Sequence, residues 1–143
     1  MNPKNYKLSE QQKREIEESI IRILCKDSRI IFAYIFGSFL SSESIKDIDI
    51  ALYIEKEIDS NLSLKLELEL ERIIQDKVRI PVDVRILNFS PLTFSFNVVK
   101  NGKVIIDKNS FLRSDFESLI FRKYFDFKHL SDEYLREVKN APL

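Results

Sequence analysis

Three short runs rich in β-branched and aromatic residues limit the possible folds most, because each is typical of a buried strand. They span residues 29–36, 47–54 and 82–87. The first run stops at Gly37, and the third opens after Pro81, a residue that interrupts helices. A fourth, shorter strand is expected at 103–106. The chain is therefore predicted to build a sheet of short strands.

The segments between these runs predict helices. Ser9 followed by Gln12 resembles a capping box, and apolar residues at helical spacing then predict a helix over 9–26. Five leucines alternate over 62–70 as in a strand, but Leu, Lys and Glu are strong helix formers. We expect a helix that begins at Asp59 or Ser60 and makes apolar contacts on two sides.

The region after residue 90 allows two interpretations. The pair at 101–102, Asn-Gly, could form a hairpin turn between strands at 96–100 and 103–106, or it could end a helix that begins at Pro91. Ser90 before a proline resembles a helix cap, which favours the helix. A long helix is expected over 109–139. Together the elements predict one α/β (α+β) domain over 1–143, with a mixed sheet flanked by helices and a long C-terminal helix.

Composition excludes some classes of partner. The 143 residues include 23 basic and 23 acidic side chains, so no overall field attracts nucleic acid or an anionic membrane. The only cysteine, Cys25, cannot form an internal disulfide, as expected in a reducing cytoplasm. Its Ile and Leu neighbours favour a small buried side chain over a reactive thiol. No signal-like or bilayer-spanning run is present, and we expect a soluble cytoplasmic protein.

Gly37 and Ser38 are the first candidate site residues. The chain has only two glycines, and this one ends a predicted strand. Glycine allows the backbone to approach a phosphate closely, and a helical turn opened by Ser38 would direct an amide and a hydroxyl at phosphate oxygens. A simple turn is the alternative interpretation.

Three aspartates form the second candidate group. Asp47 and Asp49 are two residues apart on a predicted strand, so their carboxylates share one face, and Asp83 interrupts another apolar strand. Two carboxylates at close range repel by about 4 kcal/mol at an intermediate dielectric, which a cation removes. Oxygen ligands suit magnesium better than zinc. A solvated turn would explain the aspartate pair alone.

These residues together resemble a known superfamily. The sequence reads Phe-Gly-Ser-Phe at 36–39, Asp-Ile-Asp-Ile at 47–50 and Pro-Val-Asp-Val at 81–84. In this order they look like the DNA polymerase β-type nucleotidyltransferases, specifically the minimal prokaryotic members called MNT or MntA-like antitoxins. Residues 124–128 are similar to a segment of the last helix of those proteins.

The resemblance implies a role for each site residue. Asp47 and Asp49 would bind two Mg²⁺ ions, and Asp83 would complete the second site or receive the acceptor's proton. Gly37 and Ser38 would hold the β and γ phosphates of ATP. The acceptor oxygen would attack the α-phosphorus in line and expel pyrophosphate, a reaction governed by alignment and charge neutralisation.

The resemblance also implies a partner. Antitoxins of this family transfer AMP to a tyrosine of a HEPN-domain ribonuclease toxin, which implies a hetero-oligomer. The loop over 39–46 is shorter than is usual in the family and lacks its additional glycine. Two alternatives therefore stay open: a non-catalytic antitoxin that covers its toxin, and transfer to a small molecule.

Other charged and aromatic residues receive weaker assignments. Arg85 would contact a phosphate of the nucleotide or pair with an aspartate, and the two interpretations are evenly balanced. Lys46 is expected to be solvated, and His129, the only histidine, has no evident catalytic partners. Aromatic residues of the last helix mainly predict core packing. The remainder, beside basic residues, could form a protein-docking surface, and direct nucleic-acid binding is the less favoured option.

Overall fold

The computed structural model describes residues 5–141 of the chain. The strands are β1 (Tyr6–Lys7), β2 (Ile30–Phe36), β3 (Ser44–Ile45), β4 (Ile48–Ile54), β5 (Val82–Ile86) and β6 (Lys103–Asp107). The helices are α1 (Glu10–Cys25), α2 (Ser38–Ser41), α3 (Ser60–Val78), the 3-10 turn η1 (Leu87–Phe89), α4 (Leu92–Asn101) and α5 (Ser110–Asn140).

Four strands form a mixed sheet in the order β5-β4-β2-β6. The pairs β2–β4 and β2–β6 are antiparallel, and β4–β5 is parallel. The parallel pair requires a crossover connection, which α3 provides. The predicted α/β fold with a mixed sheet is confirmed. The two-residue strands β1 and β3, which pair with each other in a separate small sheet, were not expected.

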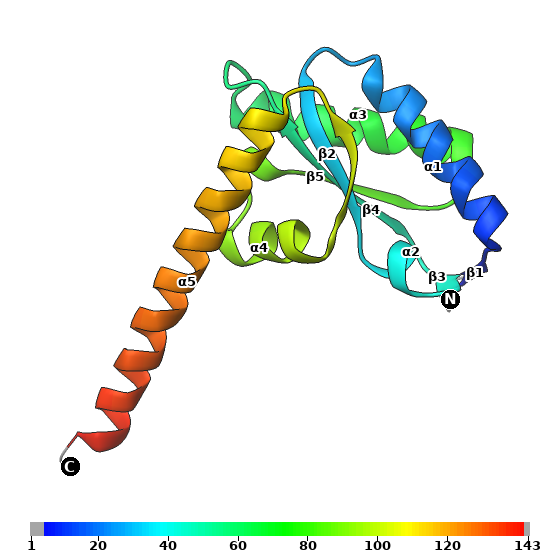
Figure 1. Ribbon diagram of the computed structural model, residues 1–143. Helices are drawn as coiled ribbons and strands as arrows, with labels where there is room; N and C mark the ends of the chain where they lie inside the picture. The colour runs from blue at the N-terminus through cyan, green and yellow to red at the C-terminus, as the bar shows by residue number, and fades with distance from the viewer. Residues whose placement is uncertain (1–4, 142–143) are drawn as a thin grey trace.

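Helices cover both faces of this sheet (Figure 1). On one face, α1 and α3 pack on a mainly aliphatic core that includes Ile20, Leu24, Ile50, Leu66, Leu70, Ile74 and Val84. On the other face, α4 and the first half of α5 pack on a smaller, aromatic cluster that includes Phe32, Tyr34, Phe36, Phe94, Val98 and Phe116. The sheet is thus buried between two layers of different composition.

The ends of α1 and α3 follow local capping rules. Ser9 and Gln12 form the predicted capping box, with each side chain accepting a hydrogen bond from the other residue's backbone N–H. The side chain of Asp59 accepts from the Leu62 N–H and caps α3. At its other end, α3 stops with Arg79 in the left-handed conformation, two residues before Pro81.

The helix predicted over the alternating leucines is confirmed, but its expected contacts on two sides are wrong. Leu66 and Leu70 are buried together with Ile74, at a spacing of four residues. The other leucines, Leu62, Leu64 and Leu68, are more than half exposed. Because a helix turns by about 100° per residue, successive leucines of the alternating pattern point about 160° apart, and only Leu66 and Leu70 lie on the face toward the sheet.

Two local predictions are corrected by the structure. Cys25 is exposed, because it occupies the last turn of α1, where its neighbour Leu24 faces the core. Ser90 does not cap α4, since its hydroxyl donates to the Ile86 carbonyl and Pro91 takes the cap position instead. The helix preferred over the hairpin is nevertheless present, and the Gly102 N–H donates to the Val98 carbonyl at its end.

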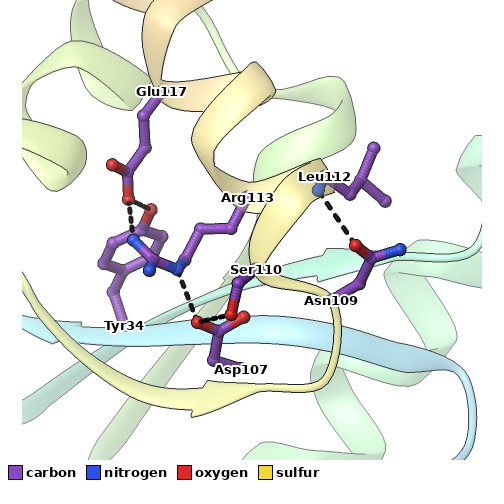
Figure 2. A network of polar contacts seen from close by, with 7 residues as sticks. All are labelled: Tyr34, Asp107, Asn109, Ser110, Leu112, Arg113 and Glu117. Atoms are coloured by element: carbon purple, nitrogen blue, oxygen red, sulfur yellow. Dashed lines mark hydrogen bonds and ion pairs between the residues drawn. The ribbon is translucent and has the colours of Figure 1, made fainter.

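A polar network joins the start of α5 to the sheet (Figure 2). The Tyr34 hydroxyl donates to Glu117 Oε1 at 2.6 Å, and Arg113 Nη1 donates to the same oxygen at 2.8 Å. Arg113 Nε and the Ser110 hydroxyl both donate to Asp107 Oδ2 at 2.9 Å. Burial and the adjacent Glu117 raise the pKa of Tyr34 well above its usual value, so the hydroxyl keeps its donor proton.

The second half of α5 extends away from the rest of the molecule (Figure 1). The helix has 31 residues, and nearly all side chains after Tyr124 are exposed. Within residues 5–141, no helix is both long enough and apolar enough to cross a membrane.

Candidate active site

Asp49 and Asp83 lie side by side on the two parallel strands of the sheet. The register of β4 and β5 pairs Asp49 with Asp83 and, on either side of them, Ile48 with Val82 and Ile50 with Val84. The apolar neighbours are buried, whereas both aspartates are partly exposed. The alternation of each strand therefore anchors the two backbones in the core and presents the two carboxylates on the opposite face.

Asp47 precedes β4 by one residue and contributes to the same electrostatic environment. The pKa of Asp49 is raised to about 6, first by burial and then by the charges of Asp47 and Asp83. The Arg85 guanidinium opposes this rise. The negative charges of Asp47 and Asp83 beside Asp49 favour the binding of a cation.

Gly37 brings the backbone against the Asp49 carboxylate. It follows β2, whose last residue, Phe36, pairs with Asp49 in the sheet register. Gly37 has φ 79° and ψ −153°, a combination that is essentially limited to glycine. A Cβ atom at this position would also overlap Asp49 Oδ2. Glycine is therefore required both by the backbone conformation and by the adjoining carboxylate.

Ser38 opens the short helix α2 immediately after this glycine. The Leu40 N–H donates to the Gly37 carbonyl, and the Ser42 N–H donates to the Ser38 carbonyl. Phe39 is buried and fixes the turn to the body, and the Lys13 ammonium group lies over its ring. The short loop over 39–46 is thus an ordered turn followed by β3, which pairs with β1.

Arg85 lies on the same strand as Asp83 and pairs with it. Arg85 Nε is 3.3 Å from Asp83 Oδ1, and both side chains are about half exposed, at 58% and 42%. A pair this exposed is worth at most about 1 kcal/mol and is easily exchanged for another partner. The structure therefore shows the aspartate pairing of Arg85 that we considered, and leaves the guanidinium accessible.

A pocket of about 410 Å³ opens beside these residues. Its lining combines the two strand aspartates with Arg85 and with apolar groups, namely Phe36, Asp49, Asp83, Arg85, Ser90, Pro91 and Phe94. Phe36 and Phe94 meet edge to face with ring centroids 5.5 Å apart. The pocket thus joins acidic oxygens, one cation and an aromatic wall, a combination that can accommodate an organic phosphate with a planar group.

The outer edge of β5 is held by side chains of α3. The backbone N–H groups of the buried residues of β5 donate to three acceptors on the helix: Val82 to Gln75 Oε1 at 2.8 Å, Val84 to Glu71 Oε1 at 3.0 Å, and Ile86 to Glu67 Oε1 at 3.3 Å. Residues four apart on a helix rise by about 6 Å and residues two apart on a strand by about 6.6 Å, so the two rows match. This ladder fixes the strand that carries Asp83 and Arg85.

Sequence reasoning did not anticipate this ladder or the aromatic wall of the pocket. The signal for the ladder was the spacing of Glu67, Glu71 and Gln75 on one side of a predicted helix that precedes the strand. For Phe94, the only signal was its position in the first turn of a helix after Pro91.

The donor set at this site suits magnesium. Carboxylate oxygens on adjacent strands, with space beside them for phosphate oxygens, are hard ligands of the type Mg²⁺ prefers. Within residues 5–141, no three acidic, histidine or cysteine side chains converge closely enough to form a complete metal cage. The paired carboxylates of Asp49 and Asp83 are the protein groups that would hold such an ion.

Comparisons with known proteins identify a family for the chain. The family model described as polymerase beta nucleotidyltransferase matches residues 18–111, which include Gly37, Ser38 and the three aspartates. No curated protein matches the chain.

Solved structures share the fold. One is a complex of a tri-AMPylated HEPN toxin from Shewanella oneidensis with MNT antitoxin, matched at 20% identity and a TM-score of 0.68 over 89% of this chain and 98% of that chain. Another is a toxin–antitoxin complex of MntA and HepT, at 20% identity and a TM-score of 0.68 over 88% and 98%. A third, a toxin–antitoxin with AMP-PNP, has 21% identity and a TM-score of 0.62 over 87% and 97%. The family model covers well over half of the chain, and the chain belongs to the polymerase β nucleotidyltransferase family.

Proposed function

We propose that this protein is a cytoplasmic antitoxin that transfers AMP from ATP to a tyrosine of a cognate HEPN-domain ribonuclease toxin. Family membership supports nucleotidyl transfer. The likeness to chains from MNT–HEPN complexes, one with a tri-AMPylated toxin, supports a protein acceptor of this kind. The three aspartates, Gly37, Ser38 and Arg85 are the residues we assign to the reaction.

The observation that carries the proposal is the pairing of Asp49 with Asp83 beside Gly37. The two aspartates occupy one register position of adjacent strands, and a Cβ atom on Gly37 would overlap the carboxylate of the first of them. Asp47, Asp49 and Asp83 would hold two Mg²⁺ ions, which supply charge neutralisation for the triphosphate and the acceptor oxygen. The raised pKa of Asp49 is consistent with a site in which a cation offsets the repulsion among these acids.

The other residues orient and bind the substrate. Gly37 leaves the backbone open to a phosphate, and the Ser38 hydroxyl and amide, at the start of α2, would donate to phosphate oxygens. Arg85 would exchange its weak pairing with Asp83 for a phosphate oxygen of the nucleotide. Asp83, released in this way, either completes the metal site or accepts the proton of the tyrosine hydroxyl.

The test uses purified protein, ATP labelled at the α-phosphate, MgCl₂ and the HEPN-domain protein proposed as its partner. We expect label on the HEPN protein, and a loss of at least a hundredfold in rate for Asp49→Asn or Asp83→Asn. Asp76→Asn on the exposed surface of α3 is the matched control and should keep the wild-type rate. Labelling that persists in both active-site variants would contradict the proposal.

A non-catalytic antitoxin is the second candidate, and one observation favours it. Asp83 already has a cationic partner in Arg85. On this alternative, the Asp49→Asn variant would still neutralise the toxin in ribonuclease assays, and no label would appear with the wild-type protein.

A further inference from the structure

The projecting half of α5 carries an unpartnered apolar stripe. Its members are each more than half exposed: Phe127, Leu130, Tyr134 and Val138. Their spacing of three and four residues places them on one face of the helix. Solvated helices normally present charged residues on such a face, so this stripe indicates a surface that another molecule covers.

The same face of α5 is buried where the helix crosses the body. Ile120 is 8% exposed, and at about 100° per residue it lies on the line of Phe127 and Val138. Phe116, Leu119, Ile120 and Lys123 of this face line a pocket of about 450 Å³ between α4, α5 and the loop after β4. The stripe and this pocket therefore form one continuous surface, which we call the α5 surface.

The charges of this pocket have one sign. Lys56 and Lys123 line it together with aliphatic, aromatic and neutral polar groups, and among residues 5–141 no acidic side chain lines it. Neither lysine makes an ion pair or a side-chain hydrogen bond within the described part of the chain. A carboxylate entering the pocket would satisfy both ammonium groups, so the complementary ligand is apolar with an acidic residue at one end.

A second copy of this chain does not fit the α5 surface. A parallel copy would direct the first half of its own α5 into the body of this copy, because Ile120, on the same helix face as the stripe, is buried against that body. In an antiparallel pair related by a two-fold axis, the residues on one side of the stripe would face the same residues of the other copy. One flank carries Asp126, Glu133 and Glu137, and these acids would face their own counterparts.

The surface also leads to the candidate active site. Ser90 lines both this pocket and the pocket that contains Asp49 and Asp83, so the two lie on either side of the segment before α4. A protein bound along α5 would contact the segment before α4, whose Ser90 also lines the pocket of the paired aspartates. This continuity indicates that the occupant is the protein that receives the nucleotide.

We propose that the α5 surface docks an amphipathic helix of the acceptor protein, with the apolar face of that helix on the stripe and an acidic residue between Lys56 and Lys123. The inference rests on the proposed function, since it takes the HEPN toxin as the acceptor. Docking through α5 selects the protein substrate, while the nucleotide binds at the aspartates.

The experiment measures binding of the purified HEPN protein to the full chain by titration calorimetry. Leu130→Asp and Lys123→Glu should each weaken binding at least tenfold, and Arg136→Asp, on the opposite face of the same helix, should bind as wild type. Circular dichroism of each variant checks that α5 still forms. Adenylylation at saturating HEPN protein should recover in Leu130→Asp, because its aspartates are intact.

Three outcomes would overturn the inference, and they are distinguishable. Equal affinities of Leu130→Asp, Lys123→Glu and wild type would exclude the α5 surface and leave the proposed function standing. Absence of HEPN binding by the wild type would remove the proposed function and the inference together. A wild-type dimer in sedimentation equilibrium that becomes monomeric in Leu130→Asp would identify a second copy as the occupant.

Discussion

The edge of β5 is covered by another element of the protein, whereas the apolar face of the free half of α5 is exposed. An edge strand exposes unpaired N–H groups, and here α3 closes that edge with Gln75, Glu71 and Glu67 at matched spacing. The apolar stripe of α5 is left exposed by the part of the chain that the structure describes. The element that bears Asp83 is therefore fixed, whereas the element we assign to partner binding is left accessible. The strand at the candidate site is thus held in one position, while the surface assigned to partner binding stays available to another protein.

The largest expected effect is on the free energy of unfolding, and it comes from comparing one substitution in each half of α5. Ile120→Ala should lower the free energy of unfolding by about 2–4 kcal/mol, because Ile120 is buried against the body. Leu130→Ala, on the same helix face, should change it by less than about 0.5 kcal/mol, since Leu130 is exposed. Urea denaturation measures both values. Similar losses for the two variants would show that the free half is packed in solution.

The second prediction concerns the closed edge. Glu71→Leu leaves the Val84 N–H without an acceptor and should destabilise the protein by about 1–2 kcal/mol, whereas Glu71→Gln keeps an acceptor oxygen and should be close to neutral. Hydrogen exchange of the Val84 amide should accelerate in Glu71→Leu alone. An unchanged exchange rate in that variant would show that the ladder does not protect the strand.

The smallest expected effect arises from the burial of Asp49 and, after that, from the neighbouring charges of Asp47 and Asp83. The pKa of Asp49 is raised to about 6, so the fold favours its neutral form, and this stabilisation is lost as pH rises from about 4 through about 6. In chelator at pH 7.5, Asp49→Asn should therefore be more stable than wild type by about 1 kcal/mol, a value reduced for partial exposure.

At pH 4 the advantage of Asp49→Asn should largely disappear, because the wild-type carboxyl is then protonated. Thermal unfolding at the two pH values provides the comparison. A variant that is less stable than wild type at pH 7.5 would mean that the aspartate stabilises the fold and is not a group under electrostatic strain.

Much of the fold follows from local sequence signals. The capping box at Ser9, the strand that stops at Gly37 and the helix over the alternating leucines all depend on neighbouring residues, and all are present. The residues of the candidate site could be predicted from sequence motifs, but the register that places Asp49 beside Asp83 could not. The pairing of Asp49 with Asp83 depends on the order of strands in the sheet, which distant contacts determine.

The failures have a common physical cause. Cys25 and the exposed leucines of α3 have apolar sequence neighbours, yet their burial depends on how each helix is rotated against the sheet. Ser90 precedes a proline as caps often do, but its hydroxyl finds the Ile86 carbonyl through the turn η1. Local patterns identify the element, while the tertiary structure decides which side chains it buries.

The polar network at the root of α5 has a consequence for association kinetics and affinity. Arg113 joins Asp107 on β6 to Glu117, which also accepts from Tyr34 on β2, so the helix is held at several points before it leaves the body. A helix with a fixed direction is preorganised, and a ligand that binds it does not have to offset the entropy of ordering it. Loosening the root with Arg113→Met should therefore slow productive encounter while every residue of the stripe remains in place.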